Sequence, residues 1–335
     1  MSNLLIGGRM HGKNGIIKVQ MNKHSLKLFA GSAHPALASA ISKLLKVDLS
    51  PIDLKKFACG EIYTRLGETV RDSDVFVIQT GTQNVNEDMM ELFIMMDSFK
   101  RSFADKVHVV MPYFPYARQD RVASPREPIS AKLMADLVSK AGANHLITFT
   151  LHSDQEQGFF DFPVDNLNAR SLFADYFKKK KLENITVVAP DVGSAKEAQR
   201  LAKMLGAELA ILNKFRSMHN VSEVTHLVGN VAGRTCILYD DLVDTAGSVA
   251  NGAGILRRHR ANKDIYLAAT HAVLSADAHK KLKKAKFKEI VFTDTIPLPK
   301  EKKLPNMEII SVAPLLASVI QNVHDGKALT PLINP

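Results

Sequence analysis

The segment with the residue types best suited to chemistry reads Cys236-Ile-Leu-Tyr-Asp-Asp-Leu-Val-Asp-Thr-Ala-Gly-Ser248. An apolar run ends in two adjacent carboxylates, Asp240 and Asp241, and the chain then reaches the predicted start of a helix. Backbone N–H groups and the hydroxyls of Thr245 and Ser248 would converge there on a phosphate, and the intervening glycine would allow a close backbone approach. The paired carboxylates could accept hydrogen bonds from sugar hydroxyls or hold a hydrated magnesium ion. The segment therefore indicates a site for a sugar phosphate.

Two other interpretations of this segment stay open on the residues alone. Aspartate and threonine after a strand can simply cap the helix that follows. The spacing Asp240-Asp-Leu-Val-Asp244 also fits the Asp-rich diphosphate motif of prenyl-transfer enzymes. That motif lies on a helix of an all-helical protein, whereas the run before Asp240 has the pattern of a strand.

The elements that must position this segment alternate along the chain. Short β-rich runs predict buried strands at residues 75–79, 107–111, 145–149, 185–189, 235–239 and 265–269. Apolar residues at three- and four-residue spacing predict helices at 35–46, 87–103, 129–141, 194–205, 246–260 and 276–286. This alternation predicts an α/β fold of mostly parallel sheets flanked by helices, in which ligands bind at the carboxyl ends of the strands.

Length and one turn-rich segment suggest how the 335 residues are divided. Asp161-Phe-Pro-Val-Asp-Asn166 separates two series of strands and helices. We expect an N-terminal extension over residues 1–24 and two similar domains over 25–167 and 168–335. The last segment of the chain can pack back on the first of these domains.

Composition excludes several classes of protein. Hydrophobic residues make up 46% and charged residues 23%, which is typical of a globular chain and excludes wholesale disorder. The two cysteines, Cys59 and Cys236, lie in separate motifs, so a disulfide framework or a cysteine zinc site is not expected. No apolar run approaches the roughly 20 residues that span a bilayer. We expect a cytoplasmic protein, with organellar targeting left open by the acid-poor first 47 residues.

The net charge of +10 allows nucleic acid, an anionic membrane or a polyanionic small substrate as partner. The basic runs at residues 178–181 and 280–286 lie on predicted polar helix faces without interleaved aromatic residues, so we expect neither nucleic acid nor membrane binding. Gly7-Gly-Arg-Met-His-Gly-Lys-Asn14 nearly matches a Walker A motif, but asparagine replaces the magnesium-binding hydroxyl. Of the three kinds of partner that the net charge allows, we therefore expect a small polyanionic substrate.

Several longer motifs narrow the prediction. They are Met111-Pro-Tyr-Phe-Pro-Tyr-Ala-Arg-Gln-Asp-Arg121, Leu151-His-Ser-Asp-Gln-Glu-Gln-Gly-Phe-Phe-Asp-Phe-Pro-Val-Asp-Asn-Leu167, Ala189-Pro-Asp-Val-Gly193 and Asp294-Thr-Ile-Pro-Leu298. Together with residues 236–248, they resemble the ribose-phosphate diphosphokinase (phosphoribosyl diphosphate synthase) family, which has the type I phosphoribosyltransferase-like fold. The resemblance covers about residues 26–325.

This resemblance implies a reaction, its cofactor and an assembly. The family moves the β,γ-diphosphoryl group of ATP to the anomeric hydroxyl of ribose 5-phosphate and releases AMP, for nucleotide biosynthesis. It uses Mg²⁺, and its members are homo-oligomers built from dimers, commonly hexamers. A catalytically weak regulatory relative of the synthase is the leading alternative, and a phosphoribosyltransferase or a diphosphate-sensing regulator of the same fold is the next.

The resemblance also implies which residues act. His152 and Asp191 match the family's metal-associated pair, and Lys214 and Arg216 match the cations of a mobile catalytic loop that contacts the transferring group. The ribose 5-phosphate side comprises Arg216, Asp240, Asp241, Asp244, Thr245, Ala246, Gly247 and Ser248. The ATP side comprises Phe57, Cys59, Gly60 and Glu61, often reaching across a subunit boundary, together with Arg118 and Gln119.

Several positions depart from the family pattern. Thr150 stands two residues before the metal histidine, where the family usually has aspartate, which predicts weaker metal binding. Cys59, Ser194 and Phe215 replace an acidic or amide residue, a glycine and an arginine, respectively. Val122-Ala-Ser-Pro125 replaces typical charged residues, which leaves phosphate activation and nucleotide inhibition open.

Overall fold

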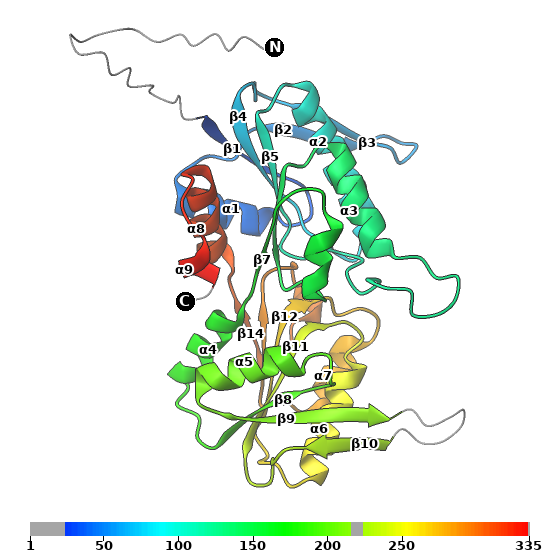
Figure 1. The fold of residues 1–335 in the computed structure, drawn as a ribbon, viewed down its shortest axis with the longest axis vertical. Coiled ribbons are helices and arrows are strands. Elements are labelled where there is room, and N and C mark those ends of the chain that lie inside the picture. The colour runs from blue at the N-terminus through cyan, green and yellow to red at the C-terminus, as the bar shows by residue number, and fades with distance from the viewer. Residues whose placement is uncertain (1–23, 216–223, 334–335) are drawn as a thin grey trace, which may run out of the picture.

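The computed structural model describes residues 24–215 and 224–333, which form two β-sheets flanked by helices and arranged end to end (Figure 1). All six predicted strands and all six predicted helices are present, and the predicted α/β class is confirmed. The predicted domain limits stay a prediction, although the first sheet ends at residue 167.

The first sheet contains five parallel strands in the order β1-β4-β5-β6-β7. β4, β5 and β6 are apolar and almost wholly buried because helices cover both faces of the sheet, as is usual for parallel strands. The strand bounds are β1 (Ser25–Ala30), β4 (Ser73–Ile78), β5 (Lys106–Val110), β6 (His145–Phe149) and β7 (Val164–Leu167).

Helices and one hairpin surround this sheet. The antiparallel hairpin of β2 (Ile52–Lys56) and β3 (Ile62–Leu66) extends beside it. The flanking helices are α1 (Pro35–Leu45), α2 (Val85–Arg101) and α3 (Ser130–Ala141), with a 3-10 turn, η1, at Asp154–Phe159.

The second sheet has seven strands in the order β10-β9-β8-β11-β12-β13-β14, parallel except for the β9–β10 pair. Its strands are β8 (Ile185–Ala189), β9 (Glu208–Phe215), β10 (Val224–Val228), β11 (Thr235–Val243), β12 (Ile265–Ala272), β13 (Glu289–Thr293) and β14 (Met307–Ile310). The associated helices are α4 (Arg170–Lys179), α5 (Ala195–Leu205), α6 (Gly247–Arg258), α7 (Ala278–Ala285), η2 (Lys300–Lys302), α8 (Ala313–His324) and α9 (Thr330–Ile333).

The C-terminal helix α8 lies against α1 of the first sheet, so the two parts of the chain share one apolar cluster (Figure 1). Leu37 and Ile41 of α1 belong to this cluster with Leu316 and Ile320 of α8, and all four are buried. The ring of His324 is also 3.0 Å (Nδ1 to Oδ2) from the Asp74 carboxylate. The chain thus returns to its first sheet after completing the second. Among the helices of the described residues, none is long and apolar enough to cross a bilayer.

Two local predictions are wrong. Asp240 and Asp241 were expected after a strand that ends at residue 239, but β11 continues to Val243 because β12 continues to pair with it beyond the end of β8. Lys214 was expected in a loop, but it lies in β9, whose backbone pairs there with that of β10. Arg216 lies outside the described residues.

Candidate active site

A cavity of about 550 Å³ opens between the two sheets at the carboxyl ends of their strands. The second sheet contributes the continuous stretch from residue 239 to 249, which includes the end of β11 and the first turn of α6. It also contributes a segment after β8, with Asp191, Gly193, Ser194 and Glu197. The first sheet contributes two separate loops. From those loops the lining residues are Arg118, Arg121, Thr150, Leu151 and His152. The cavity thus lies at the strand ends, where the sequence predicts a ligand site.

The turn between β11 and α6 is shaped to receive an anion. Ala246 precedes the helix in the left-handed conformation, with φ of 58°, and among the described residues no side chain caps the helix at that position. At the start of any helix, the first N–H groups have no acceptor within the helix itself, so they can bind an anion there. A Cβ at Gly247 would meet only the Thr245 hydroxyl, at 3.8 Å. Thr245, Gly247 and Ser248 line the cavity, so this turn can approach a phosphate closely.

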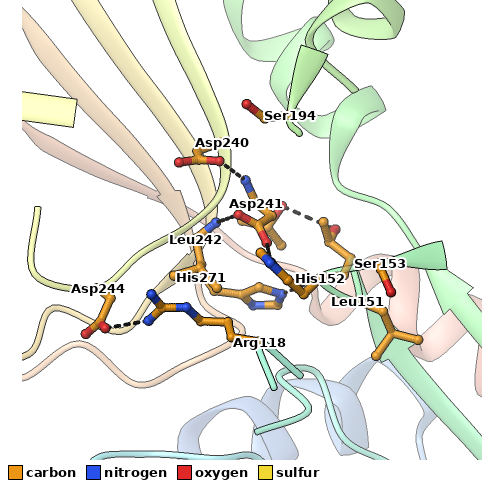
Figure 2. A network of polar contacts seen from close by, with 12 residues as sticks. Arg118, Leu151, His152, Ser153, Ser194, Asp240, Asp241, Leu242, Asp244 and His271 are labelled. Carbon is orange, nitrogen blue, oxygen red and sulfur yellow. Dashed lines mark hydrogen bonds and ion pairs between the residues drawn. The ribbon is translucent and has the colours of Figure 1, made fainter. Parts of the chain in front are cut away.

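The two adjacent aspartates have different environments, as Figure 2 shows. Asp241 Oδ2 is 2.7 Å from His152 Nδ1, while Asp240 Oδ1 accepts the Asp241 backbone N–H at 3.0 Å. Burial and the neighbouring negative charge of Asp241 raise the pKa of Asp240 well above its usual range. Burial alone would raise the pKa of Asp241 too, but the hydrogen bond from His152 lowers it. The two shifts are opposite in direction, so Asp241 loses its proton more readily than Asp240.

His152 and Asp191 stand on opposite walls of the cavity, one from each sheet. The bond to Asp241 raises the pKa of His152 and engages its Nδ1, so Nε2 is the ring nitrogen that could bind a metal ion. Asp191 Oδ1 accepts hydrogen bonds from the backbone N–H of Ser194 at 3.0 Å and from the Ser194 hydroxyl at 3.2 Å. Within residues 24–215 and 224–333, no group of three histidine, cysteine or acidic side chains forms a complete metal cluster. These two residues could hold a metal only together with ligands from a substrate or water.

Arg118 joins the two walls. Its Nη1 is 2.6 Å from Asp244 Oδ2 (Figure 2). The other oxygen of that carboxylate accepts a hydrogen bond from the Ser275 hydroxyl. The guanidinium is half exposed, so this ion pair contributes little stability, and an anionic ligand could replace it. Arg118 is therefore a phosphate-binding candidate at the edge of the cavity.

Other predicted residues do not line this cavity. Gln119 lies beside it but hydrogen-bonds to the hydroxyl of Ser130 through its side chain. Phe57, Cys59, Gly60 and Glu61 form the tip of the β2–β3 hairpin, and the Phe57 ring is 47% exposed. The structure thus separates the predicted adenine-contacting segment from the cavity of its own chain.

Arg121, Glu197 and His271 carry functional side chains at the site but were not among the predicted site residues. Arg121 and Glu197 line the cavity, and the buried side chain of His271 lies beside those of Asp241 and His152 (Figure 2). His271 follows the predicted strand at 265–269 by two residues, so the rule that placed Asp240 after its strand could also have found it. Arg121 lies within the Arg118-Gln-Asp-Arg121 motif and was not singled out.

The amino-acid sequence matches the domain models and the sequences of known proteins over most of its length. Residues 26–142 match the model of the N-terminal domain of ribose phosphate pyrophosphokinase, and residues 219–334 match that of the phosphoribosyl synthetase-associated domain. The chain is 47% identical to the ribose-phosphate pyrophosphokinase of Caldanaerobacter subterraneus subsp. tengcongensis, covering 92% of this chain and 98% of that one. Identity to the enzyme of the same name from Bacillus caldolyticus is 45%, covering 93% and 99%.

A solved structure shares the whole arrangement. The crystal structure of phosphoribosylpyrophosphate synthetase from Mycobacterium smegmatis superposes with a TM-score of 0.86 at 41% identity, covering 90% of this chain and 99% of that one. Similarity of this extent leaves no large part of either protein unmatched. The chain therefore belongs to the ribose-phosphate pyrophosphokinase (diphosphokinase) family.

Proposed function

We propose that this chain is a ribose-phosphate diphosphokinase, which transfers the β,γ-diphosphoryl group of ATP to the 1-hydroxyl of ribose 5-phosphate and releases AMP. The chain is 47% and 45% identical, over nearly its full length, to two enzymes of that name, which supports this activity. The observation that carries it is the shared cavity, where the anion-binding turn of one sheet faces Arg118 and His152 of the other. A cavity with these two walls can hold a sugar phosphate beside a nucleotide.

The sugar phosphate belongs on the second sheet. We name residues 240–248 the sugar-phosphate loop. Its helix-terminal N–H groups and the hydroxyls of Thr245 and Ser248 would hold the 5-phosphate. Asp240 and Asp241 would accept hydrogen bonds from the ribose hydroxyls, and a protonated Asp240 could also donate one. The loop would thereby orient the 1-hydroxyl toward the nucleotide wall.

The nucleotide belongs at the first sheet. The Arg118 guanidinium would exchange Asp244 for a phosphate of ATP, since a phosphate carries more negative charge and accepts in the same fork geometry. We place adenine against the exposed Phe57 ring and Glu61 carboxylate of a second subunit, with Cys59, Gly60 and Gln119 nearby. This arrangement requires a dimer-based homo-oligomer, such as a hexamer, which size-exclusion chromatography with light scattering would detect.

The charge of the reacting groups calls for cations. Lys214 and Arg216 would neutralise the transferring diphosphoryl group, whose negative charge rises as the β-phosphorus is attacked. His152 Nε2 and Asp191 fit Mg²⁺ as an incomplete ligand set that substrate phosphates and water would complete. When bound, Mg²⁺ would screen and align the phosphates. The bond from Asp241 fixes the ring of His152 for this purpose.

A coupled assay that follows AMP and phosphoribosyl diphosphate together tests the activity. We expect both products in equal amounts from ATP, ribose 5-phosphate and magnesium, and neither when the sugar phosphate is omitted. Running the assay with and without inorganic phosphate would determine whether phosphate activates this chain. ATP consumption that yields ADP, or binding of both substrates without turnover, would contradict the proposal.

A further inference from the structure

One buried histidine connects the two walls of the cavity. His271, near the end of β12 in the second sheet, is only 2% exposed. Its Nε2 is 3.1 Å from the Phe149 carbonyl oxygen and 3.3 Å from that of Thr150, both at the end of β6 in the first sheet. Its Nδ1 is 3.0 Å from the Thr295 hydroxyl. The ring therefore joins strand ends that belong to different sheets.

The surroundings determine which nitrogen carries the proton. Both partners of Nε2 are carbonyl oxygens, which only accept, so Nε2 must carry the hydrogen and donate it. Burial lowers the pKa of His271 to about 4, so the ring is neutral near pH 7 and Nδ1 keeps its lone pair. The side chain thus acts as a single, fixed donor toward β6.

The backbone that receives this hydrogen bond leads directly to His152. Thr150 has a φ of 43°, an uncommon conformation for a β-branched residue, so neighbouring contacts must hold it in place. Its N–H donates to the Leu167 carbonyl at 2.8 Å, and the next N–H, of Leu151, donates to Asn166 Oδ1 at 3.1 Å. Those bonds tie the segment to its own sheet.

Contacts from the second sheet complete the support. The Thr150 and Thr270 hydroxyl oxygens are 3.3 Å apart, and the Thr80 hydroxyl donates to the Thr295 carbonyl at 2.8 Å. Of these contacts across the junction, only that of His271 donates to the β6 backbone just before His152. A shift there would move His152 relative to Asp241 and the sugar-phosphate loop.

We propose that His271 is a positioning residue, which sets the register between the two sheets so that His152 stands correctly against the sugar-phosphate loop. The inference rests on the proposed function, since His152 serves there as a metal ligand. It also makes a specific claim about the kinetics. Ribose 5-phosphate binds one sheet only, so its affinity should not depend on His271, whereas turnover requires both walls and should depend on it.

Substitutions that differ in hydrogen-bond reach test this claim. We expect His271→Leu to lower kcat about 30-fold, because a misplacement of about 1 Å can cost 10²-fold. The calorimetric Kd for ribose 5-phosphate should change less than about twofold. In His271→Gln, the amide nitrogen lies near the position of Nε2, so kcat should recover to within about fivefold of the wild type. In His271→Asn the shorter amide cannot reach, and kcat should stay low.

A matched control comes from β6, the strand whose backbone His271 contacts. His145 begins β6, is similarly buried, and hydrogen-bonds Asp165 at 2.9 Å within the first sheet only. His145→Leu should lower the thermal midpoint while leaving kcat near that of the wild type. Equal kcat in His271→Gln and His271→Asn would overturn the proposal, even if His271→Leu does not fold. Loss of ribose 5-phosphate binding in step with kcat would also overturn it. A wild type without activity would contradict the proposed function instead.

Discussion

The two walls of the cavity are built in different ways. The second sheet supplies most of its lining from one continuous stretch, residues 239–249, and adds four residues between 191 and 197 from the segment after β8. The first sheet supplies only short pieces of two loops, Arg118 and Arg121 from one and residues 150–152 from the other. A continuous stretch keeps its geometry through local turns and a helix terminus. Separate loops keep theirs only through contacts such as those of His271 and Asn166. The first wall should therefore be more sensitive to distant substitutions, and the second to changes within the loop itself.

The largest expected effect tests which wall supplies the catalytic charge. Lys214→Ala should lower kcat about 10³-fold, because a cation that acts mainly on the transition state contributes several kcal/mol. The affinity for ATP should stay largely unchanged, since the nucleotide binds the other wall. Single-turnover kinetics and equilibrium binding of ATP would separate the two quantities. Lys203→Ala, on the exposed side of α5, is the control, and near-normal turnover of Lys214→Ala would defeat the assignment.

A second prediction separates the adjacent aspartates. Asp241→Asn removes the charged partner of His152, and loss of such a partner typically costs about 10- to 100-fold in activity. Asp240→Asn should cost less than about tenfold, because an amide oxygen can still accept the Asp241 N–H. Steady-state kinetics at saturating magnesium would show the contrast. If the two variants lost equal activity, the prediction that Asp241 contributes more to activity than Asp240 would be wrong.

The same contrast between continuous and assembled walls explains what could be predicted from the sequence. Residues 236–248 were predicted as a strand, a turn and a helix start because a continuous apolar run, carboxylates and small residues are local signals. The extension of β11 to Val243 could not be read locally, because it depends on pairing with β12. His152 and Arg118 were identified through family motifs rather than physical pattern. The support from His271 requires contacts between residues 122 and 121 positions apart in the chain, which no local pattern encodes.

A third prediction concerns the stability of the assembled wall. Glu156 is fully buried three residues after Ser153, whose N–H donates to its Oε1 at 2.8 Å, while Oε2 has no partner among the described residues. Burial raises the pKa of this carboxyl to about 7 from an ordinary 4.5. The folded protein therefore binds this proton more tightly than the unfolded chain. The stabilisation is complete below about pH 4.5 and is lost as the pH rises through about 7.

Glu156→Gln should remove that dependence while keeping the bond to Ser153, because the amide oxygen still accepts. We expect the wild type to lose about 3 kcal/mol relative to the variant between pH 4.5 and pH 8. Urea unfolding of both proteins across this range measures the difference, in which the contributions of other groups cancel. A constant difference across the range would show that the carboxyl does not titrate near neutrality.

The smallest expected effect concerns a departure within the same wall. Thr150 occupies the position where the family usually has aspartate, two residues before His152, and its φ of 43° is unfavourable for a β-branched side chain. Thr150→Asp should relieve this strain, since aspartate tolerates the left-handed region, and should add negative charge beside the proposed metal site. We expect a magnesium requirement about two- to fivefold below that of the wild type, measured as the concentration that gives half-maximal activity at fixed free ATP.

Thr150→Asn separates the two causes, because asparagine tolerates the same backbone conformation and adds no charge. This variant should gain thermal stability like Thr150→Asp but keep the magnesium requirement of the wild type. If asparagine lowered the requirement equally, backbone strain rather than the missing carboxylate would be responsible. If neither variant changed the magnesium requirement, metal binding would depend on the second sheet rather than on the loop that contains Thr150. The two walls would then differ less in sensitivity to substitution than their lining suggests.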